Sequence, residues 1–140
     1  MRVLIDTCIV IDALQSREPF CVAAQKIFIA AASAQINGII SAKALTDIYC
    51  LVHRHTHDNK EARDVLNKLI TVFDVSDTAG IDCQRAIVSE ISDYEDAVMA
   101  ETAQRIGADC IVTRNIRDYA RSPVPAVLPE DLLKIVERDS

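Results

Sequence analysis

The sequence predicts an α/β fold, a three-layer α/β/α sandwich with a central parallel sheet. Short apolar runs that suit buried strands alternate with longer segments of helical periodicity, and this alternation is typical of parallel sheets covered by helices on both faces. The 140 residues are half apolar, with only four prolines and three glycines, and they contain no internal repeat, linker or low-complexity segment. We therefore expect one domain spanning residues 1–140.

The first four elements follow from short runs and their breaks. Val3–Ile5 is an apolar run that predicts a strand, and residues 9–14 predict a short helix directly after it. Residues 20–34 are rich in alanine and predict a second helix. The pair Asn37–Gly38 breaks this pattern, and Ile39–Ile40 suggests the next strand.

Two helices and a strand are expected in the middle of the chain. Residues 42–55 carry apolar side chains along one helical stripe, and residues 58–70 repeat the pattern with charged residues on one side. Residues 71–73, Thr-Val-Phe, resemble a third strand.

The last third of the chain predicts three helices and a strand. Residues 77–89 and 93–106 have helical patterns, and Cys110–Val112 is an apolar run that predicts a strand. A turn marked by Pro123 and Pro125 precedes a final helix at residues 130–137.

Composition limits the cellular setting and the mode of binding. The net charge of −6 repels a polyanion at long range, so nucleic-acid binding would need a local site, a bound cation or a partner. The N-terminus has no signal-peptide pattern, and no apolar run approaches the roughly 18–20 residues that span a bilayer. Five cysteines without a Cys-x-x-Cys pair indicate reduced, mostly buried thiols in a cytoplasmic protein without a membrane segment: Cys8, Cys21, Cys50, Cys83 and Cys110.

Polar side chains follow two of the predicted strands. Asp6 comes directly after Val3–Ile5, and Thr113, Asn115 and Asp118 follow Cys110–Val112. In open parallel sheets the ligand crevice lies beyond the carboxyl ends of the strands. We therefore expect these groups to meet in one crevice.

Two predicted helices bring further acids. Asp47 lies at the border of the inward stripe of the helix at 42–55. Asp93 and Asp96 share a side with small residues near the start of the helix at 93–106. Clustered carboxylates repel one another unless a cation neutralises them, and hard oxygen ligands select Mg²⁺ or Mn²⁺. This pattern points to metal-assisted attack of water on a phosphodiester.

Each acid also has a purely structural interpretation. Asp6 suits a helix N-cap, and the later helix suits a cap at Ser92 or Asp93, with Glu95 or Asp96 at its third position. Asp47 is one turn after Lys43 and suits a surface ion pair, and Asp118 suits a turn. Only the joint placement of these acids favours chemistry.

Four motifs, read in order, carry a family resemblance. They are Leu-Ile-Asp6-Thr-Cys-Ile-Val-Ile-Asp12, Ile-Ile-Ser41 with Asp47, Asp93-Tyr-Glu-Asp96-Ala, and Ile-Val-Thr113-Arg-Asn115-Ile-Arg-Asp118-Tyr. In order and spacing the sequence resembles a PIN domain over nearly its whole length, and in size it looks like the small prokaryotic VapC-like toxins.

The resemblance implies a central parallel sheet, an acidic pocket for Mg²⁺ or Mn²⁺, an endoribonuclease activity, a cognate antitoxin and a homodimer. Asp6, Asp47, Asp96 and Asp118 match the catalytic acids, of which Asp6, Asp96 and Asp118 are expected to hold metal. Supporting roles are expected for four residues: Ser41, Asp93, Thr113 and Asn115.

Three positions depart from the family pattern. Asp47 stands where glutamate is more common, and Asn115 stands where many relatives have aspartate. Both changes weaken the expected site for a second metal. Cys8 replaces the commoner asparagine beside Asp6.

Two other groups are candidates for chemistry. Arg114, Arg117 and Arg121 follow the last predicted strand and are candidates for binding RNA phosphates, with a solvated loop as the alternative. His53, His55 and His57 alternate along a predicted helix, so they cannot face one ion unless the helix has ended.

The sequence therefore predicts a Mg²⁺- or Mn²⁺-dependent endoribonuclease that cleaves single-stranded RNA, as the toxin of a toxin–antitoxin pair. One alternative is a catalytically degraded PIN domain that binds RNA or protein. A phosphotransfer domain is a second alternative, although an Asp-x-Asp-x-Thr motif is absent.

Overall fold

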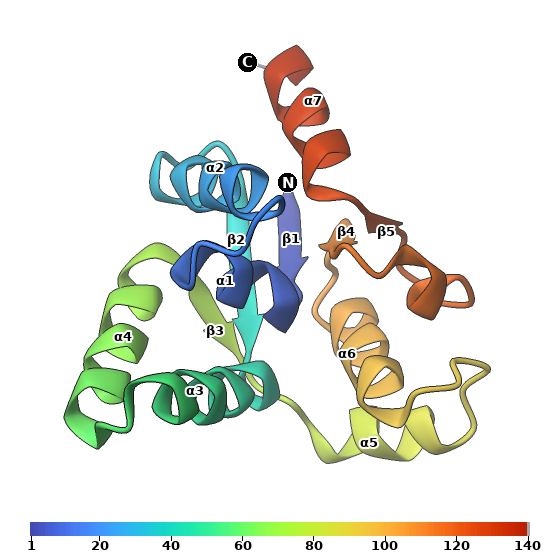
Figure 1. Cartoon of the computed structure of the whole chain (residues 1–140). Coiled ribbons are helices and arrows are strands. Elements are labelled where there is room, and N and C mark those ends of the chain that lie inside the picture. Colours follow the sequence, from blue (N-terminus) through green and yellow to red (C-terminus); the bar gives the residue numbers. More distant parts are fainter. Residues whose placement is uncertain (140) are drawn as a thin grey trace.

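A computed structural model describes residues 1–139. Its five strands form one parallel sheet in the order β3-β2-β1-β4-β5, and helices cover both faces (Figure 1). The elements in chain order are β1 Arg2–Ile5, α1 Thr7–Leu14, α2 Cys21–Ala32, β2 Asn37–Ser41, α3 Ala42–Thr56, α4 Asn59–Val72, β3 Asp74–Ser76, α5 Gly80–Ile87, α6 Tyr94–Arg105, β4 Cys110–Val112, the 3₁₀ helix η1 Ile116–Tyr119, β5 Ala126–Val127 and α7 Pro129–Asp139. The predicted α/β/α fold class is confirmed.

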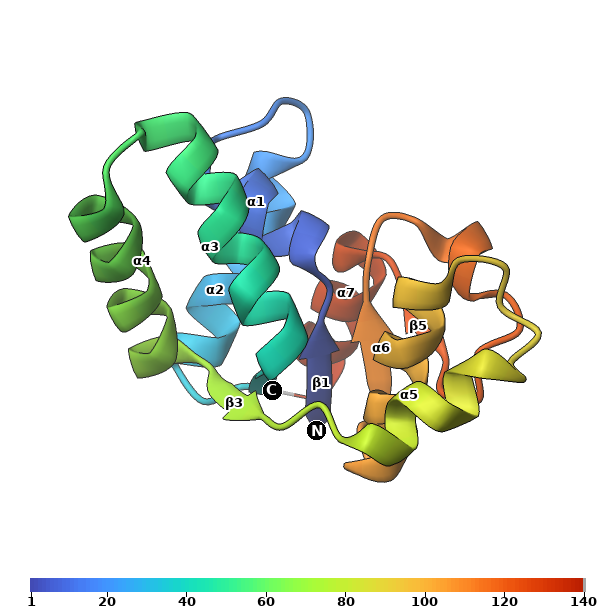
Figure 2. The same cartoon turned by 90° about the horizontal axis from the view of Figure 1, so that it is seen from below.

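Strand order explains which helices share a face. From β1 the chain steps to β2 and β3 in one direction, and from β3 it crosses back to β4 and β5 in the other. Because such crossovers are right-handed, the two directions place their helices on opposite faces. Helices α1 to α4 lie on one side of the sheet and α5 and α6 on the other (Figure 2). Helix α7 returns to pack against α2.

The buried apolar residues form one contiguous cluster around the central strands. Val3, Leu4 and Ile5 of β1 and Ile111 and Val112 of β4 are fully buried, as expected for strands covered on both faces. Short apolar runs could therefore be recognised as strands from sequence.

The predicted strand at residues 71–73 is wrong. Thr71 and Val72 complete α4, and the Phe73 amide still donates to the Leu69 carbonyl, so the strand begins only at Asp74. β-Branched residues favour strands locally, but the helical hydrogen bonds continue through them. Phe73 is buried beside Gly38, where an added Cβ would lie 2.7 Å from its ring.

Other elements differ in extent or were missed. The helix predicted at residues 77–89 is shortened to α5, because residues 77–79 form a loop that precedes it. The two-residue strand β5 follows the proline turn directly, and the 3₁₀ helix η1 occupies the polar segment after β4. Such short elements have too few residues to show a period.

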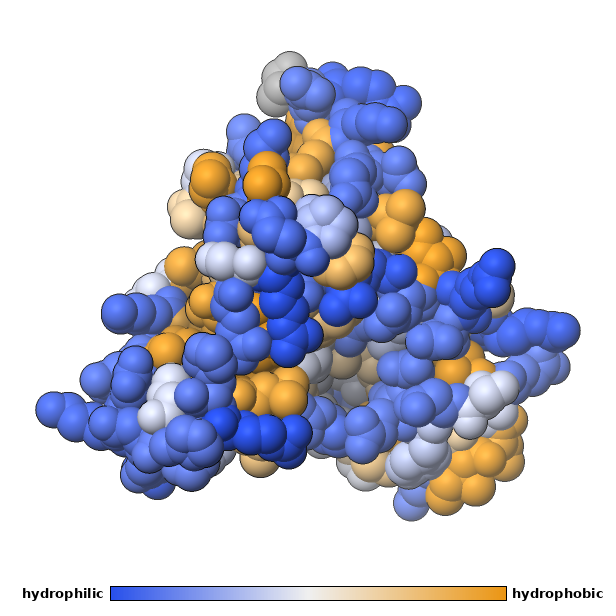
Figure 3. Space-filling model, in the orientation of Figure 1, coloured by the Kyte–Doolittle hydropathy of each residue, from blue (hydrophilic) through white to orange (hydrophobic). Residues whose placement is uncertain are grey.

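The structure tests two expectations from composition and shows one exposed apolar patch. Cysteines 21 and 110 are buried, but Cys50 is exposed, so the expectation of mostly buried thiols holds only in part. None of the described helices is long and apolar enough to cross a membrane. An apolar patch lies over the end of α5, where Ile87 and Val88 are exposed (Figure 3).

Candidate active site

A cavity of about 380 Å³ opens at the carboxyl ends of the central strands. The arrowheads of β1 and β2 point toward the space between α3 and α6 (Figure 1), and the molecular surface is hollowed there (Figure 3). Five carboxylates line the cavity, together with Ser41 and Asn115: Asp6, Asp47, Glu95, Asp96 and Asp118. The structure thus gathers all four predicted catalytic acids around one cavity.

Asp6 follows β1 directly and is 8 % exposed. Its Oδ1 accepts from the Thr7 amide at 2.8 Å, so it caps α1 as the structural interpretation expected. Its Oδ2 accepts from the Thr113 hydroxyl at 2.7 Å. Burial raises the pKa of Asp6, although these hydrogen bonds partly oppose the rise. The cap and the second hydrogen bond together fix the orientation of this carboxylate.

Thr113 joins β1 to the segment after β4. The Thr113 side chain is fully buried. Its hydroxyl donates to Asp6 and accepts from the backbone N–H of Asn115 at 3.0 Å. Cys8 lies beside both groups, with Sγ 3.6 Å from Asp6 Oδ2. Burial and the charge of Asp6 raise the pKa of Cys8 to about 11, so its thiol is protonated and donates weakly. Cys8 therefore contributes a hydrogen bond to Asp6.

Asp96 lies in the first turn of α6 and is half-buried. Asp93 caps this helix by accepting from the Asp96 amide at 3.0 Å, and it lies outside the cavity lining. Burial, then the charges of Asp93 and Asp6, raise the pKa of Asp96 to about 6, while a hydrogen bond from Tyr119 at 3.2 Å lowers it. The negative charges near Asp96 are therefore incompletely compensated by the protein.

Asp118 sits in η1 and is exposed. It lines the main cavity, and its charge is one of those that raise the pKa of Asp96. It also lines a smaller surface pocket together with Asp93, Arg117 and Arg121. The turn interpretation is correct for its backbone, but the side chain also belongs to the cavity.

Asp47 is partly neutralised by the protein itself. Lys43 Nζ lies 2.5 Å from Asp47 Oδ2 and 3.7 Å from Glu95 Oε2, so it links α3 to α6 across the cavity. Burial opposes the charge of Lys43, but the hydrogen bond and charge of Asp47, with Glu95, raise its pKa. The expected ion pair is present, and a cation bound at Asp47 would have to displace Lys43.

The three arginines expected to bind phosphates have different surroundings. Arg114 is held by the fully buried Asp12, at 2.6 Å and 3.2 Å, and lies 4.3 Å over the Phe20 ring. This side chain is engaged internally, contrary to expectation. Arg121 pairs on the surface with Glu90 at 3.0 Å. Arg117 is exposed and outside the main cavity lining.

Two buried aspartates were missed by the sequence analysis. Asp12 interrupts the apolar run Ile9-Val10-Ile11, and this was the available signal that it needs a partner. Asp82 has no such context in sequence. Both are fully buried and paired with an arginine, so they stabilise the walls of the site without lining it.

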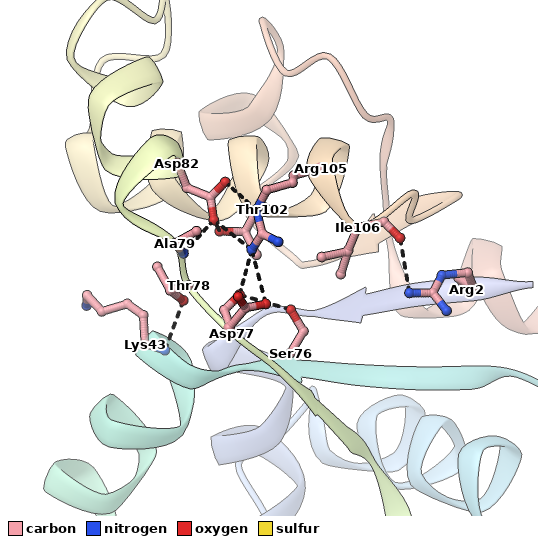
Figure 4. Close-up of polar contacts among 10 residues, drawn as sticks. All are labelled: Arg2, Lys43, Ser76, Asp77, Thr78, Ala79, Asp82, Thr102, Arg105 and Ile106. Atoms are coloured by element: carbon pink, nitrogen blue, oxygen red, sulfur yellow. Dashed lines mark hydrogen bonds and ion pairs between the residues drawn. The ribbon is translucent and has the colours of Figure 1, made fainter.

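Asp82 joins α5 to α6 through three partners (Figure 4). It accepts from the Ala79 amide at 2.9 Å, from the Thr102 hydroxyl at 2.9 Å, and from Arg105 at 2.9 Å and 3.0 Å. Burial would raise the pKa of Asp82, but these donors, Arg105 foremost, lower it overall. The loop at residues 77–79, which precedes α5, also contacts α3, because the backbone N–H of Lys43 donates to the Thr78 hydroxyl at 3.2 Å.

The fit of a metal rests on the chemistry of the donors. Within residues 1–139, no group of three His, Cys, Asp or Glu side chains is already arranged to hold an ion. However, Asp6, Asp96 and Asp118 line one cavity, and the pKa of Asp96 is raised first by burial and then by nearby carboxylates, which include Asp6 and Asp118. Their hard oxygens suit Mg²⁺ or Mn²⁺. His53 and His55 lie on different faces of α3, His57 follows its last residue, Thr56, and the three are not part of any such group in residues 1–139.

The parallel sheet and the acidic cavity beyond its carboxyl edge define an α/β protein with a candidate hydrolytic site. A family model described as PIN domain matches residues 2–117. The chain therefore belongs to the PIN domain family, and the predicted resemblance is confirmed.

Several solved structures have the same fold. A toxin–antitoxin complex from Klebsiella pneumoniae is 23% identical, with a TM-score of 0.68, and the match covers 91% of this chain and 97% of that one. VapBC2 from Rickettsia felis, bound to a DNA fragment from its promoter, is 16% identical with a TM-score of 0.69 over 91% and 98% of the chains.

A third relative has a described target. VapC20 from Mycobacterium tuberculosis, a toxin that cleaves the sarcin-ricin loop, is 13% identical with a TM-score of 0.61 over 78% and 86% of the chains. No curated protein sequence matches the chain. At these identities the structural neighbours establish the fold.

Proposed function

We propose that this protein is a Mg²⁺- or Mn²⁺-dependent endoribonuclease that cleaves single-stranded RNA. The observation that carries the proposal is the convergence of Asp6, Asp96 and Asp118 on one cavity at the carboxyl edge of the sheet, in a PIN domain. Asp47 contributes a fourth carboxylate to this cavity. Five acids around one cavity need a positive charge, and a phosphodiester needs one to react.

Three carboxylates would hold the ion: Asp6, Asp96 and Asp118. When bound, a divalent ion lowers the pKa of a coordinated water and stabilises charge on the phosphate oxygens. Thr113 and the Thr7 amide hold Asp6 in one orientation, and the Tyr119 hydroxyl donates a hydrogen bond to Asp96. The pKa of Tyr119 is raised by burial and by the neighbouring acids, so it remains a proton donor to Asp96. Asn115 supplies a neutral amide at the cavity wall.

The same proposal includes a toxin–antitoxin role, with a cognate antitoxin, a cytoplasmic location and a homodimer. Its support is the similarity in fold to toxins of toxin–antitoxin complexes. Growth arrest on expression of this chain alone, relieved by co-expression of a small neighbouring open reading frame, is the expected result. Sedimentation of the purified chain tests the dimer.

The decisive experiment is cleavage of an end-labelled, mixed-sequence RNA with Mg²⁺, with Mn²⁺ and with EDTA. Asp6→Asn removes a charge but little volume and should abolish metal-dependent cleavage. Asp64→Asn is the matched control, because Asp64 is exposed on α4 and outside the cavity lining. Cleavage by Asp6→Asn at the wild-type rate, in a nuclease-free preparation, would refute the role of Asp6.

A degraded, non-catalytic PIN domain is the second candidate. It is favoured by the ion pair between Lys43 and Asp47 and by the neutral Asn115, both of which reduce the negative charge available to metal. Its expected signature is RNA or protein binding without metal-dependent turnover. Membership of the PIN family leaves the phosphotransfer alternative without support.

A further inference from the structure

The acidic cavity needs a positive group of the protein to receive a polyanionic strand. Five carboxylates line it, and the whole chain carries a net charge of −6. Within the described residues, the basic side chains in the cavity lining are Lys43 and Arg54, both on α3. These two side chains differ in whether they already pair with carboxylates of the protein.

Lys43 is committed to the protein. Its ammonium group contacts Asp47 and Glu95, and its side chain is only 35% exposed. A phosphate that approached it would compete with two carboxylates at once. Its charge therefore serves mainly to hold the cavity walls together.

Arg54 has no comparable partner. Its side chain is exposed, and over residues 1–139 its guanidinium makes no hydrogen bond or ion pair. It lies two helical turns after Asp47, about 10 Å along the axis of α3. Cys50 and Leu51, which also line the cavity, lie on the same side of the helix between them. Arg54 thus extends the cavity wall away from the acids.

The arginines after β4 offer no equivalent group in this cavity. Arg114 is held by Asp12 and Phe20, Arg121 pairs with Glu90, and Arg117 lies outside the main lining. Among the cations that line this cavity in the described part of the chain, only Arg54 has a guanidinium free to form two parallel hydrogen bonds to a phosphate.

We propose that Arg54 binds a backbone phosphate of the RNA strand, so that the strand lies along α3 with its scissile bond toward Asp6 and Asp96. This inference rests on the proposed ribonuclease function and assigns its substrate contact. The phosphate contact explains how an acidic protein binds a polyanion locally. Arg54 also lies in the last turn of α3, where the helix dipole stabilises a positive charge. Its removal could therefore lower the stability of the protein, so stability is measured alongside binding.

The test measures binding of a short fluorescein-labelled, mixed-sequence single-stranded RNA by anisotropy in EDTA, which prevents metal-dependent cleavage. Salt is varied from about 50 to 200 mM. The proteins are the wild type, Arg54→Ala, Arg54→Lys and the control Arg138→Ala, which removes an exposed arginine of α7 outside the cavity lining. Thermal unfolding of each variant checks the fold.

Arg54→Ala is expected to weaken binding several-fold and to make the slope of log K against log salt shallower by about 0.7, the value for one phosphate contact on a single strand. Arg54→Lys should keep the slope, and Arg138→Ala should match the wild type. Equal affinity and slope for Arg54→Ala and the wild type would overturn the inference, as would a wild type that does not bind RNA at the lowest salt.

The two proposals fail in different ways. A wild type that binds RNA through Arg54 but never cleaves it with Mg²⁺ or Mn²⁺ overturns the nuclease and leaves the phosphate contact standing. A wild type that cleaves RNA, with an unchanged KM in Arg54→Ala, overturns the phosphate contact and leaves the nuclease standing.

Discussion

Loss of the Asp12 carboxylate should destabilise the protein strongly. Asp12 is fully buried, and Arg114 donates to both of its oxygens at 2.6 Å and 3.2 Å. Removing one partner of a buried ion pair leaves the other charge uncompensated and costs about 3–5 kcal/mol. Because the Arg114 side chain is 27% exposed, water can solvate it in part, and we expect about 3 kcal/mol for Asp12→Ala.

The assay is urea unfolding followed by circular dichroism, with the free energy of unfolding extrapolated to water. A loss of about 3 kcal/mol is a large part of the roughly 5–15 kcal/mol that stabilises a domain. The double variant Asp12→Leu with Arg114→Met replaces the pair with apolar groups and should recover most of the loss. A change below about 1 kcal/mol for Asp12→Ala would refute the reasoning.

Two further predictions concern pairs at the cavity walls. Asp82→Asn should lower the stability by about 2–4 kcal/mol at pH 7, because Asp82 accepts from Arg105 in a buried position. The folded pKa of Asp82 is lowered, so its contribution is present above the unfolded pKa near 3.8 and is lost as the pH falls through the folded pKa. The gap between wild type and variant should therefore narrow below about pH 4, and equal gaps at pH 7 and pH 3 would contradict this. Lys43→Met should increase the affinity for Mn²⁺ several-fold in calorimetric titration, because it frees Asp47, whereas unchanged affinity would show that Lys43 does not compete.

Controls for these variants are available on the same chain. Lys60→Met removes an exposed lysine of α4 outside the cavity lining and should leave Mn²⁺ affinity unchanged. Asp64→Asn, also on α4, should leave stability nearly unchanged at both pH values. These controls separate local effects from a change in net charge.

Much of the fold was predictable because its signals are local. The buried runs at Val3–Ile5 and Cys110–Val112 are continuous and apolar, whereas α3 and α4 bury only residues spaced three to seven apart along one side. The failure at residues 71–73 has the same origin, since Thr71 and Val72 favour a strand locally while hydrogen bonding continues α4 through them. Neither β5 nor η1 is long enough to show a pattern.

The acids of the candidate site were also predictable in part. Asp6 follows a strand directly, and parallel strands end at a common edge, so its place near the residues after β4 follows from topology. For Asp47 and Asp93 the sequence allowed both a structural and a chemical interpretation. The structure shows an ion pair for Asp47 and a helix cap for Asp93, and only Asp47 lines the cavity.

The sequence by itself determined the class of fold, the family and the acids that follow the strands, because each rests on short local patterns and on their order along the chain. Tertiary structure alone decided which charges are free. Arg114 meets Asp12 across 102 residues, and Arg105 meets Asp82 across 23 residues. The first pair forms because β1 and β4 are neighbours in the sheet, and the second because α5 packs against α6. No local pattern distinguishes the engaged Arg114 from the free Arg54.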